Sequence, residues 1–236
     1  MTDPTRLLIH GATGRMGQAL LRLAAERDDL RVVAAASRRE PEALPAGVQW
    51  LPASDLDRAP AFDVAIDFSL PEAFDGVLAL CAARGAALVS GTTGLDEAQR
   101  AALDATAGHV PVVWAANFSL GVAVLADLVE RAARALRDWD CDIVESHHVH
   151  KKDAPSGTAL ALGARAEAGG ASPRFASLRA GDIVGEHLVQ FATAGERIEL
   201  VHRATSRDIF ARGALHVARR LHGRAPGAYR VADLLD

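Results

Sequence analysis

Cysteines, long apolar runs and excess positive charge are all scarce in this chain of 236 residues, and each scarcity excludes a class of protein. The two cysteines, Cys81 and Cys141, lie in apolar segments, so we expect reduced, buried thiols without a disulfide or metal. No apolar run approaches the ~20 residues that a transmembrane helix needs. The first residues lack the charged and apolar regions of a signal peptide. We therefore expect a cytoplasmic protein that does not bind membranes.

The net charge of −4 argues against a general nucleic-acid-binding protein, which would usually be basic. Hydrophobic residues make up 50% of the chain and charged residues 24%, which is typical of a globular protein with a large core. This length suits one large domain or two small ones.

A strand, a glycine-rich turn and a helix are predicted at the start of the chain. Arg6–His10 is apolar, Gly11–Gly17 has the spacing G-x-x-G-x-x-G, and Gln18–Glu26 is rich in Ala and Leu. This order is typical of a dinucleotide-binding unit, in which glycines let the backbone approach a pyrophosphate and the helix start binds it. A tight turn that binds no ligand is the alternative interpretation.

Two arginines follow the second predicted strand, Leu30–Ala36. The adenosine ribose of a dinucleotide is expected at this point, where an acidic residue would favour NAD. Arg38 and Arg39 instead offer planar guanidinium groups that suit a 2′-phosphate. We expect NADPH to be preferred, with NADH as a second cofactor; a solvated basic loop is the alternative.

Predicted strands and helices alternate through the rest of the first half, which indicates a mostly parallel sheet. Ligands bind at the carboxyl edge of such sheets. Three segments follow predicted strands at that edge: Ser69–Leu70, Gly91–Thr93 and Ala115–Phe118. Gly91–Thr93 can offer backbone and hydroxyl groups to a nicotinamide ribose, or can be a plain turn.

The second half contains three predicted strands with few helices between them, at Phe175–Arg179, Glu186–Ala192 and Glu196–His202. We therefore predict an α/β protein with a Rossmann-like parallel-sheet domain and an α+β substrate and oligomerisation domain, whose sheet is mainly antiparallel. The first domain is expected at residues 1–118, completed by 207–236, and the second at 119–206.

The segment Glu145–Ala159 concentrates three histidines and two lysines between a predicted strand and a predicted helix. Three interpretations compete. A metal site is weakened because His147 and His148, adjacent on a strand, point to opposite faces, and no carboxylate or cysteine joins His148 and His150. Structural histidines at a sheet edge are the second interpretation. The third is acid–base chemistry beside an anion site, because a histidine can exchange a proton near neutral pH and a helix start offers free donors.

This segment resembles the signature of the dihydrodipicolinate reductase family. Further motifs that resemble the family pattern, in the same order, are Gly11–Gly17, Gly91–Gly94, Ala115–Ser119 and Arg179–His187. The resemblance extends from about Arg6 to the C-terminus. It implies NAD(P)H-dependent reduction of 4-hydroxy-tetrahydrodipicolinate, a cyclic dicarboxylate, to tetrahydrodipicolinate in the diaminopimelate and lysine pathway. It also implies a homotetramer built through the sheets of the second domain.

The resemblance also implies a role for individual residues. His147 matches the general acid and Lys151 a second catalytic position. Substrate-binding positions match His148, Ser156, Gly157 and Thr158. Together with Arg38 and Arg39, the expected cofactor contacts are Gly11, Ala12, Thr13, Gly14, Arg15, Met16, Gly91, Thr92, Thr93, Ala115, Ala116, Asn117 and Phe118.

Two features depart from the family pattern. Arg38 replaces an acidic residue that many members carry, and the segment between Thr158 and Arg179 is shorter than in many members. Two other functions remain open at this point: another nicotinamide-dependent reductase of a small anionic substrate, similar to aspartate dehydrogenase, or a non-catalytic NADP sensor.

Overall fold

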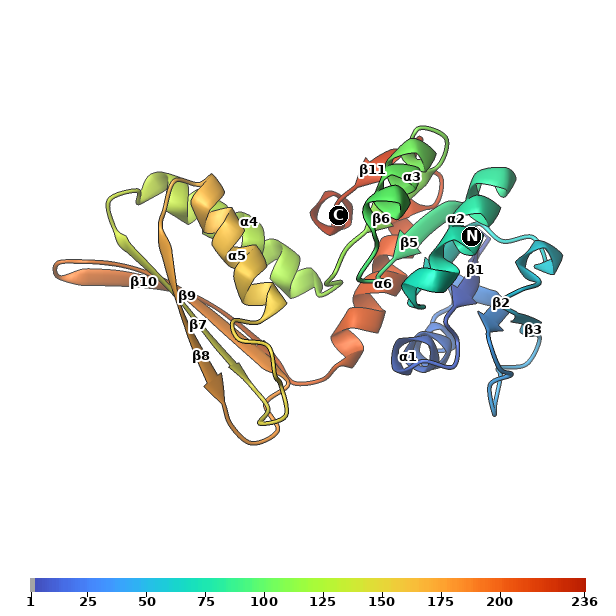
Figure 1. Ribbon diagram of the computed structural model, residues 1–236, viewed down its shortest axis with the longest axis horizontal. Helices are drawn as coiled ribbons and strands as arrows, with labels where there is room; N and C mark the ends of the chain where they lie inside the picture. Colours follow the sequence, from blue (N-terminus) through green and yellow to red (C-terminus); the bar gives the residue numbers. More distant parts are fainter. Residues whose placement is uncertain (1–2) are drawn as a thin grey trace. The chain divides into compact units, whose positions relative to one another are not determined.

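The computed structural model describes residues 3–236 and divides into two compact units (Figure 1). One unit comprises Met1–Phe118 and Phe210–Asp236, and the other comprises Ser119–Ile209. Met1 and Thr2, which the predicted first domain includes, lie outside the described residues. The chain therefore leaves the first unit once and returns to it near the C-terminus.

The first unit is built on a seven-stranded sheet with the order β11-β6-β5-β4-β1-β2-β3, in which every neighbouring pair is parallel. Its strands are β1 (Thr5–His10), β2 (Leu30–Ser37), β3 (Gln49–Pro52), β4 (Val64–Asp67), β5 (Ala87–Ser90), β6 (Pro111–Trp114) and β11 (Gly227–Tyr229). The strand order reverses direction between β1 and β4. In open α/β sheets this switch point, at the carboxyl ends of the strands, is where ligands bind.

Helices α1 (Arg15–Ala24), α2 (Pro71–Arg84), α3 (Glu97–Ala107) and α6 (Asp208–Leu221) flank this sheet, with 3₁₀ turns η1 (Leu56–Arg58) and η2 (Val231–Leu234). Local sequence explains where two of them begin and end. Pro71 occupies the first position of α2, where its missing N–H leaves no bond unmade, and Gly85 ends that helix in the left-handed conformation. Asp96 caps α3: its side chain accepts the backbone N–H of Gln99, and the Gln99 side chain accepts the backbone N–H of Asp96.

The second unit is a four-stranded sheet with the order β10-β9-β7-β8, packed against two helices (Figure 1). Its elements are α4 (Leu120–Ala135), β7 (Asp140–His147), α5 (Gly157–Ala168), β8 (Pro173–Arg179), β9 (Gly185–Thr193) and β10 (Glu196–Ala204). The pairs β10–β9 and β9–β7 are antiparallel, and β7–β8 is parallel. Apolar side chains of α4 and α5 form one core with Ile143, Val189 and Phe191 of the sheet.

The predicted fold class is confirmed: a parallel Rossmann-like sheet and a mainly antiparallel sheet form the two units. The prediction did not include β11, a three-residue strand that pairs with β6. Within residues 3–236, no helix combines the length and apolarity needed to span a membrane. Both cysteines are buried and unpaired by disulfides.

Candidate active site

The glycine-rich turn after β1 is shaped for close approach of its backbone to a ligand. Gly11 has φ 81°, and a Cβ added there would lie 2.4 Å from the carbonyl oxygen of Phe68. A Cβ added at Gly17 would lie 2.3 Å from the carbonyl oxygen of Gly11. Gly14 precedes α1 and provides no side-chain cap, so the N–H groups of the first turn remain available. These residues fit the pyrophosphate of a dinucleotide.

A cavity of about 550 Å³ lies at the switch point of the first sheet. Its lining comes from the turn after β1, including Gly11 and Thr13, and from the loop after β4, including Phe68 and Ser69. Arg38 also lines it. The cavity is therefore where the strand order predicts a dinucleotide to bind.

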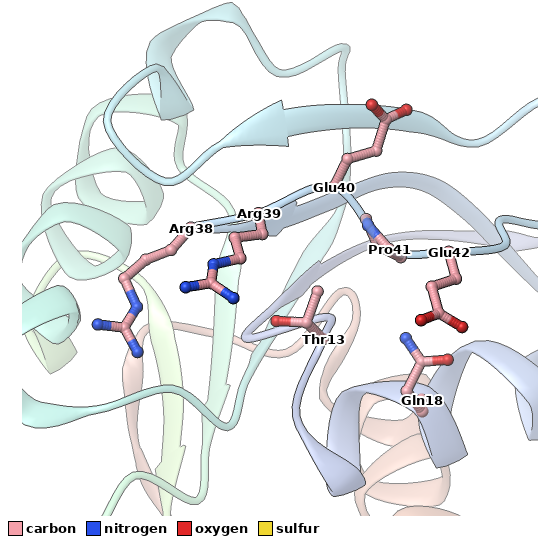
Figure 2. Close-up of a pocket in the computed structure, with 7 residues that line it drawn as sticks. All are labelled: Thr13, Gln18, Arg38, Arg39, Glu40, Pro41 and Glu42. Carbon is pink, nitrogen blue, oxygen red and sulfur yellow. The ribbon is translucent and has the colours of Figure 1, made fainter.

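Arg38 and Arg39 line a second cavity of about 770 Å³ with Thr13, Gln18, Glu40, Pro41 and Glu42. In Figure 2 the side chains of Arg38 and Arg39 extend to the same side of the loop, whereas that of Glu40 extends to the opposite side. Arg38 lines both cavities. The arginines are thus placed where they can meet a phosphate on the adenosine ribose.

The loop after β5 is fixed by a buried network. Thr92 is buried, and its hydroxyl donates to Oδ2 of Asp67 at 2.8 Å and accepts the backbone N–H of Ser69 at 3.1 Å. A Cβ added at Gly91 would lie 2.1 Å from the ring of Phe68. The Thr92 hydroxyl is therefore occupied by hydrogen bonds within the protein. The groups of this loop that remain for a ligand are its backbone and the side chain of the exposed Thr93.

The loop after β6 lies next to the loop after β5. Ala115 N–H donates to the carbonyl of Ser90 at 3.1 Å, and the Trp114 indole donates to the carbonyl of Thr92 at 2.8 Å. Phe118 is buried, with its ring 5.5 Å from that of Phe68 in an edge-to-face arrangement. The first unit thus brings the expected cofactor loops Gly11–Met16, Gly91–Thr93 and Ala115–Phe118 to one sheet edge.

In the second unit, the end of β7 carries a histidine held by a carboxylate. Nδ1 of His147 lies 2.5 Å from Oε2 of Glu145, two residues earlier on the same face of the strand. Arg179 of β8 binds both oxygens of Glu145, at 2.8 and 2.7 Å. Burial by itself raises the pKa of Glu145, but hydrogen bonds led by those of Arg179 outweigh it and lower that pKa to about 2.

Lys151 and His148 already have partners. The Lys151 ammonium donates to both oxygens of Asp153, at 2.9 and 2.8 Å. Nε2 of His148 accepts from Nη2 of Arg207 at 3.1 Å, and its buried Nδ1 has no partner among the described residues. Desolvation and the nearby positive charge of Arg207 lower the pKa of His148. The lowered pKa favours the neutral form of His148, so the positive charge around it comes from Lys151 and Arg207, as an anionic substrate would require.

The start of α5 follows the same loop. Ser156 caps the helix: its hydroxyl accepts the Ala159 N–H at 3.1 Å and lies 3.1 Å from Nε2 of His187. Burial lowers the pKa of His187 to about 4, with a smaller contribution from His147. Gly157 is exposed, and nothing would lie within 4 Å of an added Cβ. The open position at Gly157 leaves room for a carboxylate at the helix start.

Several residues of this arrangement were not singled out from the sequence as site residues: Asp67, Glu145, Arg179, His187 and Arg207. Glu145 had a detectable signal, because it precedes His147 by the two residues that put both on one face of a strand. Asp67, Arg179 and His187 lie on strands and Arg207 lies in the turn before α6, and all four meet partners that are distant in the chain. No group of three His, Cys, Asp or Glu side chains within residues 3–236 is arranged to hold a metal ion.

Comparison with known proteins gave consistent results over the whole chain. Residues 5–118 match the family model "Dihydrodipicolinate reductase, N-terminus", and residues 121–235 match "Dihydrodipicolinate reductase, C-terminus". The chain is 71% identical over 235 residues to the 4-hydroxy-tetrahydrodipicolinate reductase of Stenotrophomonas maltophilia (strain R551-3), covering 99% of this chain and 98% of that protein. It is 67% identical to the enzyme of the same name from Xanthomonas campestris pv. campestris (strain B100), covering 99% of both chains.

Among solved structures, the fold is similar to that of dipicolinate-bound dihydrodipicolinate reductase from Paenisporosarcina sp. TG-14. The TM-score is 0.84 at 20% sequence identity, covering 96% of this chain and 97% of that one.

Proposed function

The chain belongs to the dihydrodipicolinate reductase family, and we propose that it reduces 4-hydroxy-tetrahydrodipicolinate to tetrahydrodipicolinate with a nicotinamide cofactor. It is an oxidoreductase of the diaminopimelate and lysine pathway. The observation that carries this proposal is the placement of His147, with its Nδ1 held by a buried carboxylate, close in sequence to the open helix start at Gly157. A proton donor beside an anion site is what reduction of a cyclic dicarboxylate requires.

The second unit binds the substrate. The first turn of α5 receives one carboxylate through the backbone at Gly157 and Thr158, while Ser156 holds the turn in place as its cap. Lys151 balances the negative charge of the substrate, and His148 contacts the substrate as a neutral imidazole. His147 delivers the proton that accompanies reduction, and Lys151 assists.

The first unit binds the cofactor. Gly11–Met16 receive the pyrophosphate, and Gly91–Thr93 and Ala115–Phe118 contact the nicotinamide half. Arg38 and Arg39 bind the 2′-phosphate, so NADPH is preferred and NADH is the second cofactor; both arginines line the cavity of about 770 Å³. A nicotinamide held by these loops would supply the hydride for C4 of the substrate ring, and the 4-hydroxyl group leaves as water in the overall reaction.

The proposed oligomeric state and cellular location are those expected from the sequence. The protein is a cytoplasmic homotetramer that associates through the sheet of the second unit. Exposed apolar side chains on β8 and β10 support this assembly: Phe175, Leu178, Ile198 and Val201.

A coupled assay tests the function. Pyruvate, aspartate semialdehyde and the preceding synthase are supplied, and oxidation of NADPH and of NADH is followed after adding this protein. We expect NADPH oxidation that depends on the synthase and on both of its substrates. Absence of oxidation with either cofactor would refute the reductase function, and binding of NADPH without turnover would point to a sensor. Oxidation with oxaloacetate and ammonia instead would identify an aspartate-dehydrogenase-like enzyme.

A further inference from the structure

Glu145 is the most connected carboxylate of the second unit. Its side chain is completely buried near the carboxyl end of β7. Besides Nδ1 of His147 and the two nitrogens of Arg179, its Oε1 accepts the backbone N–H of Ser156 at 3.1 Å. One carboxylate thus joins the proposed acid, the start of α5 and strand β8.

Arg179 extends this network to the loop that carries Lys151. Its Nη2 donates to the carbonyl of Asp153 at 2.6 Å, and its Nε donates to the carbonyl of Lys151 at 3.3 Å. A carboxylate without solvent contact is stable only when it is paired and hydrogen-bonded, and the bidentate guanidinium of Arg179 provides that pairing. Glu145 is therefore an ionised acceptor at neutral pH.

An ionised carboxylate can only accept hydrogen bonds, so the imidazole nitrogen that faces it must carry a hydrogen. That nitrogen is Nδ1 of His147, which leaves Nε2 as the nitrogen that exchanges a proton with a ligand. The surroundings of Nε2 agree with this assignment. Gly185 lies opposite, and a Cβ added there would be 3.0 Å from Nε2, so the glycine keeps that side of the ring uncrowded.

We propose that Glu145 is the positioning residue of the site: it holds His147 with Nδ1 protonated and Nε2 as the proton-donating atom, while fixing the start of α5 through Ser156. The tautomer and ring position follow from the geometry alone. Only the step that they serve, protonation during reduction, rests on the proposed function.

Nitrogen NMR of isotope-labelled, full-length protein tests the tautomer directly, with the His147 signals assigned by loss in His147→Gln. We expect wild-type protein at neutral pH to show the form with hydrogen on Nδ1. In Glu145→Gln we expect a mixture of the two tautomers, because a glutamine amide can donate or accept. Asp142→Asn is the matched control. Asp142 lies on β7, as Glu145 does, and its exposed pair is with Arg174 of β8, so we expect its loss to leave the His147 signals unchanged.

Kinetics gives the second measurement. In Glu145→Gln, kcat falls about 10- to 100-fold, as for other residues that orient a functional imidazole, while the KM for the nicotinamide cofactor stays within about twofold. Because Glu145→Gln leaves Arg179 without its counter-charge, the double variant Glu145→Gln, Arg179→Met removes both charges and replaces the single variant if that does not fold.

The proposal is overturned if Nδ1 of His147 carries no hydrogen in the wild-type protein, or if the His147 signals are the same in wild type and in the folded variant. An enzyme with the expected tautomer and no reductase activity would refute the proposed function and leave the positioning of His147 standing.

Discussion

His10 and Asp67 form a buried pair at the carboxyl ends of β1 and β4, with Nδ1 of His10 2.9 Å from Oδ1 of Asp67. The two strands are neighbours, and these residues are directly paired across them. Asp67 also accepts hydrogen bonds from the hydroxyls of Ser90 and Thr92, both at 2.8 Å, and from the N–H of Ser69 at 3.2 Å. A single carboxylate therefore ties together the ends of β1, β4 and β5, and the loops after β1 and β5 are expected cofactor loops.

Replacing Asp67 by Asn should weaken both the fold and cofactor binding. Burial raises the pKa of Asp67, but hydrogen bonds led by that of His10 outweigh it and lower the pKa below its ordinary value, so the group is an anion with several donors. Breaking such a pair costs about 3 to 5 kcal/mol. We expect a loss of this size in the free energy of unfolding, measured by urea denaturation, and weaker NADPH binding, measured by calorimetry.

Asp63→Asn is the matched control for that experiment. Asp63 pairs with Arg6 at the amino ends of the same two strands, 2.6 Å apart, but Arg6 is half exposed. Its loss should cost about 1 kcal/mol or less and leave NADPH binding unchanged. Equal effects of the two substitutions on NADPH binding would refute a special role for Asp67 at the cofactor edge.

Arg38→Asp should reduce discrimination between the two cofactors. Hydrogen bonds to charged groups contribute about 1.5 to 3 kcal/mol, so the Kd for NADPH should rise about 10- to 100-fold while the Kd for NADH changes little. Titrations of each cofactor by fluorescence measure both values. Arg31→Asp, at the exposed amino end of the same strand, makes the same charge change far from the cavity and serves as control. Equal weakening of NADPH and NADH by Arg38→Asp would exclude the 2′-phosphate assignment.

His147→Gln and Lys151→Ala should each lower kcat by about 10²- to 10⁴-fold, because a positioned proton donor contributes that much. NADPH binding should persist, since both residues belong to the second unit. His150→Gln and Lys152→Ala are controls of the same residue types at exposed positions of the same loop. Wild-type turnover in His147→Gln would contradict its role as the acid.

Acid should destabilise the protein through His187. Burial lowers its pKa from 6.5 to about 4, so between these values the unfolded chain binds a proton that the folded chain does not. Stability is therefore full above pH 6.5 and falls as the pH drops toward 4, by at most about 3 kcal/mol. His187→Gln should flatten this part of the curve of melting temperature against pH.

Other groups also bear on that measurement. Burial lowers the pKa of His202, and desolvation and Arg207 lower that of His148, so some slope should remain in the His187→Gln variant. Glu145, with its pKa near 2, contributes stability that is lost only below about pH 4.5. His109→Gln, at an exposed position, should leave the curve unchanged. A wild-type slope retained in full by His187→Gln would rule out this origin.

The sequence predicted the elements that depend on local signals. The alternation of apolar strands with helices gave the parallel sheet, and Gly11, Gly14 and Gly17 marked the turn that the structure confirms as a close-packed strand–helix connection. The short strand β11 was missed because three residues, Gly227–Tyr229, carry no periodicity and pair only where β6 offers an edge. The parallel pairing of β7 with β8 was likewise not predictable, because neither strand's sequence alone shows which strand it pairs with or in which direction.

The sequence by itself determined the family and which residue types gather between Glu145 and Ala159, because that motif is contiguous in the chain. Only the tertiary structure decided what those residues contact. Glu145 meets Arg179 across 34 positions, and Ser156 meets His187 across 31. Such pairs form when segments distant in sequence pack together, and a buried polar group is stable only when it has a hydrogen-bonding partner. The polar contacts that position His147 therefore belong to the fold as much as to the motif.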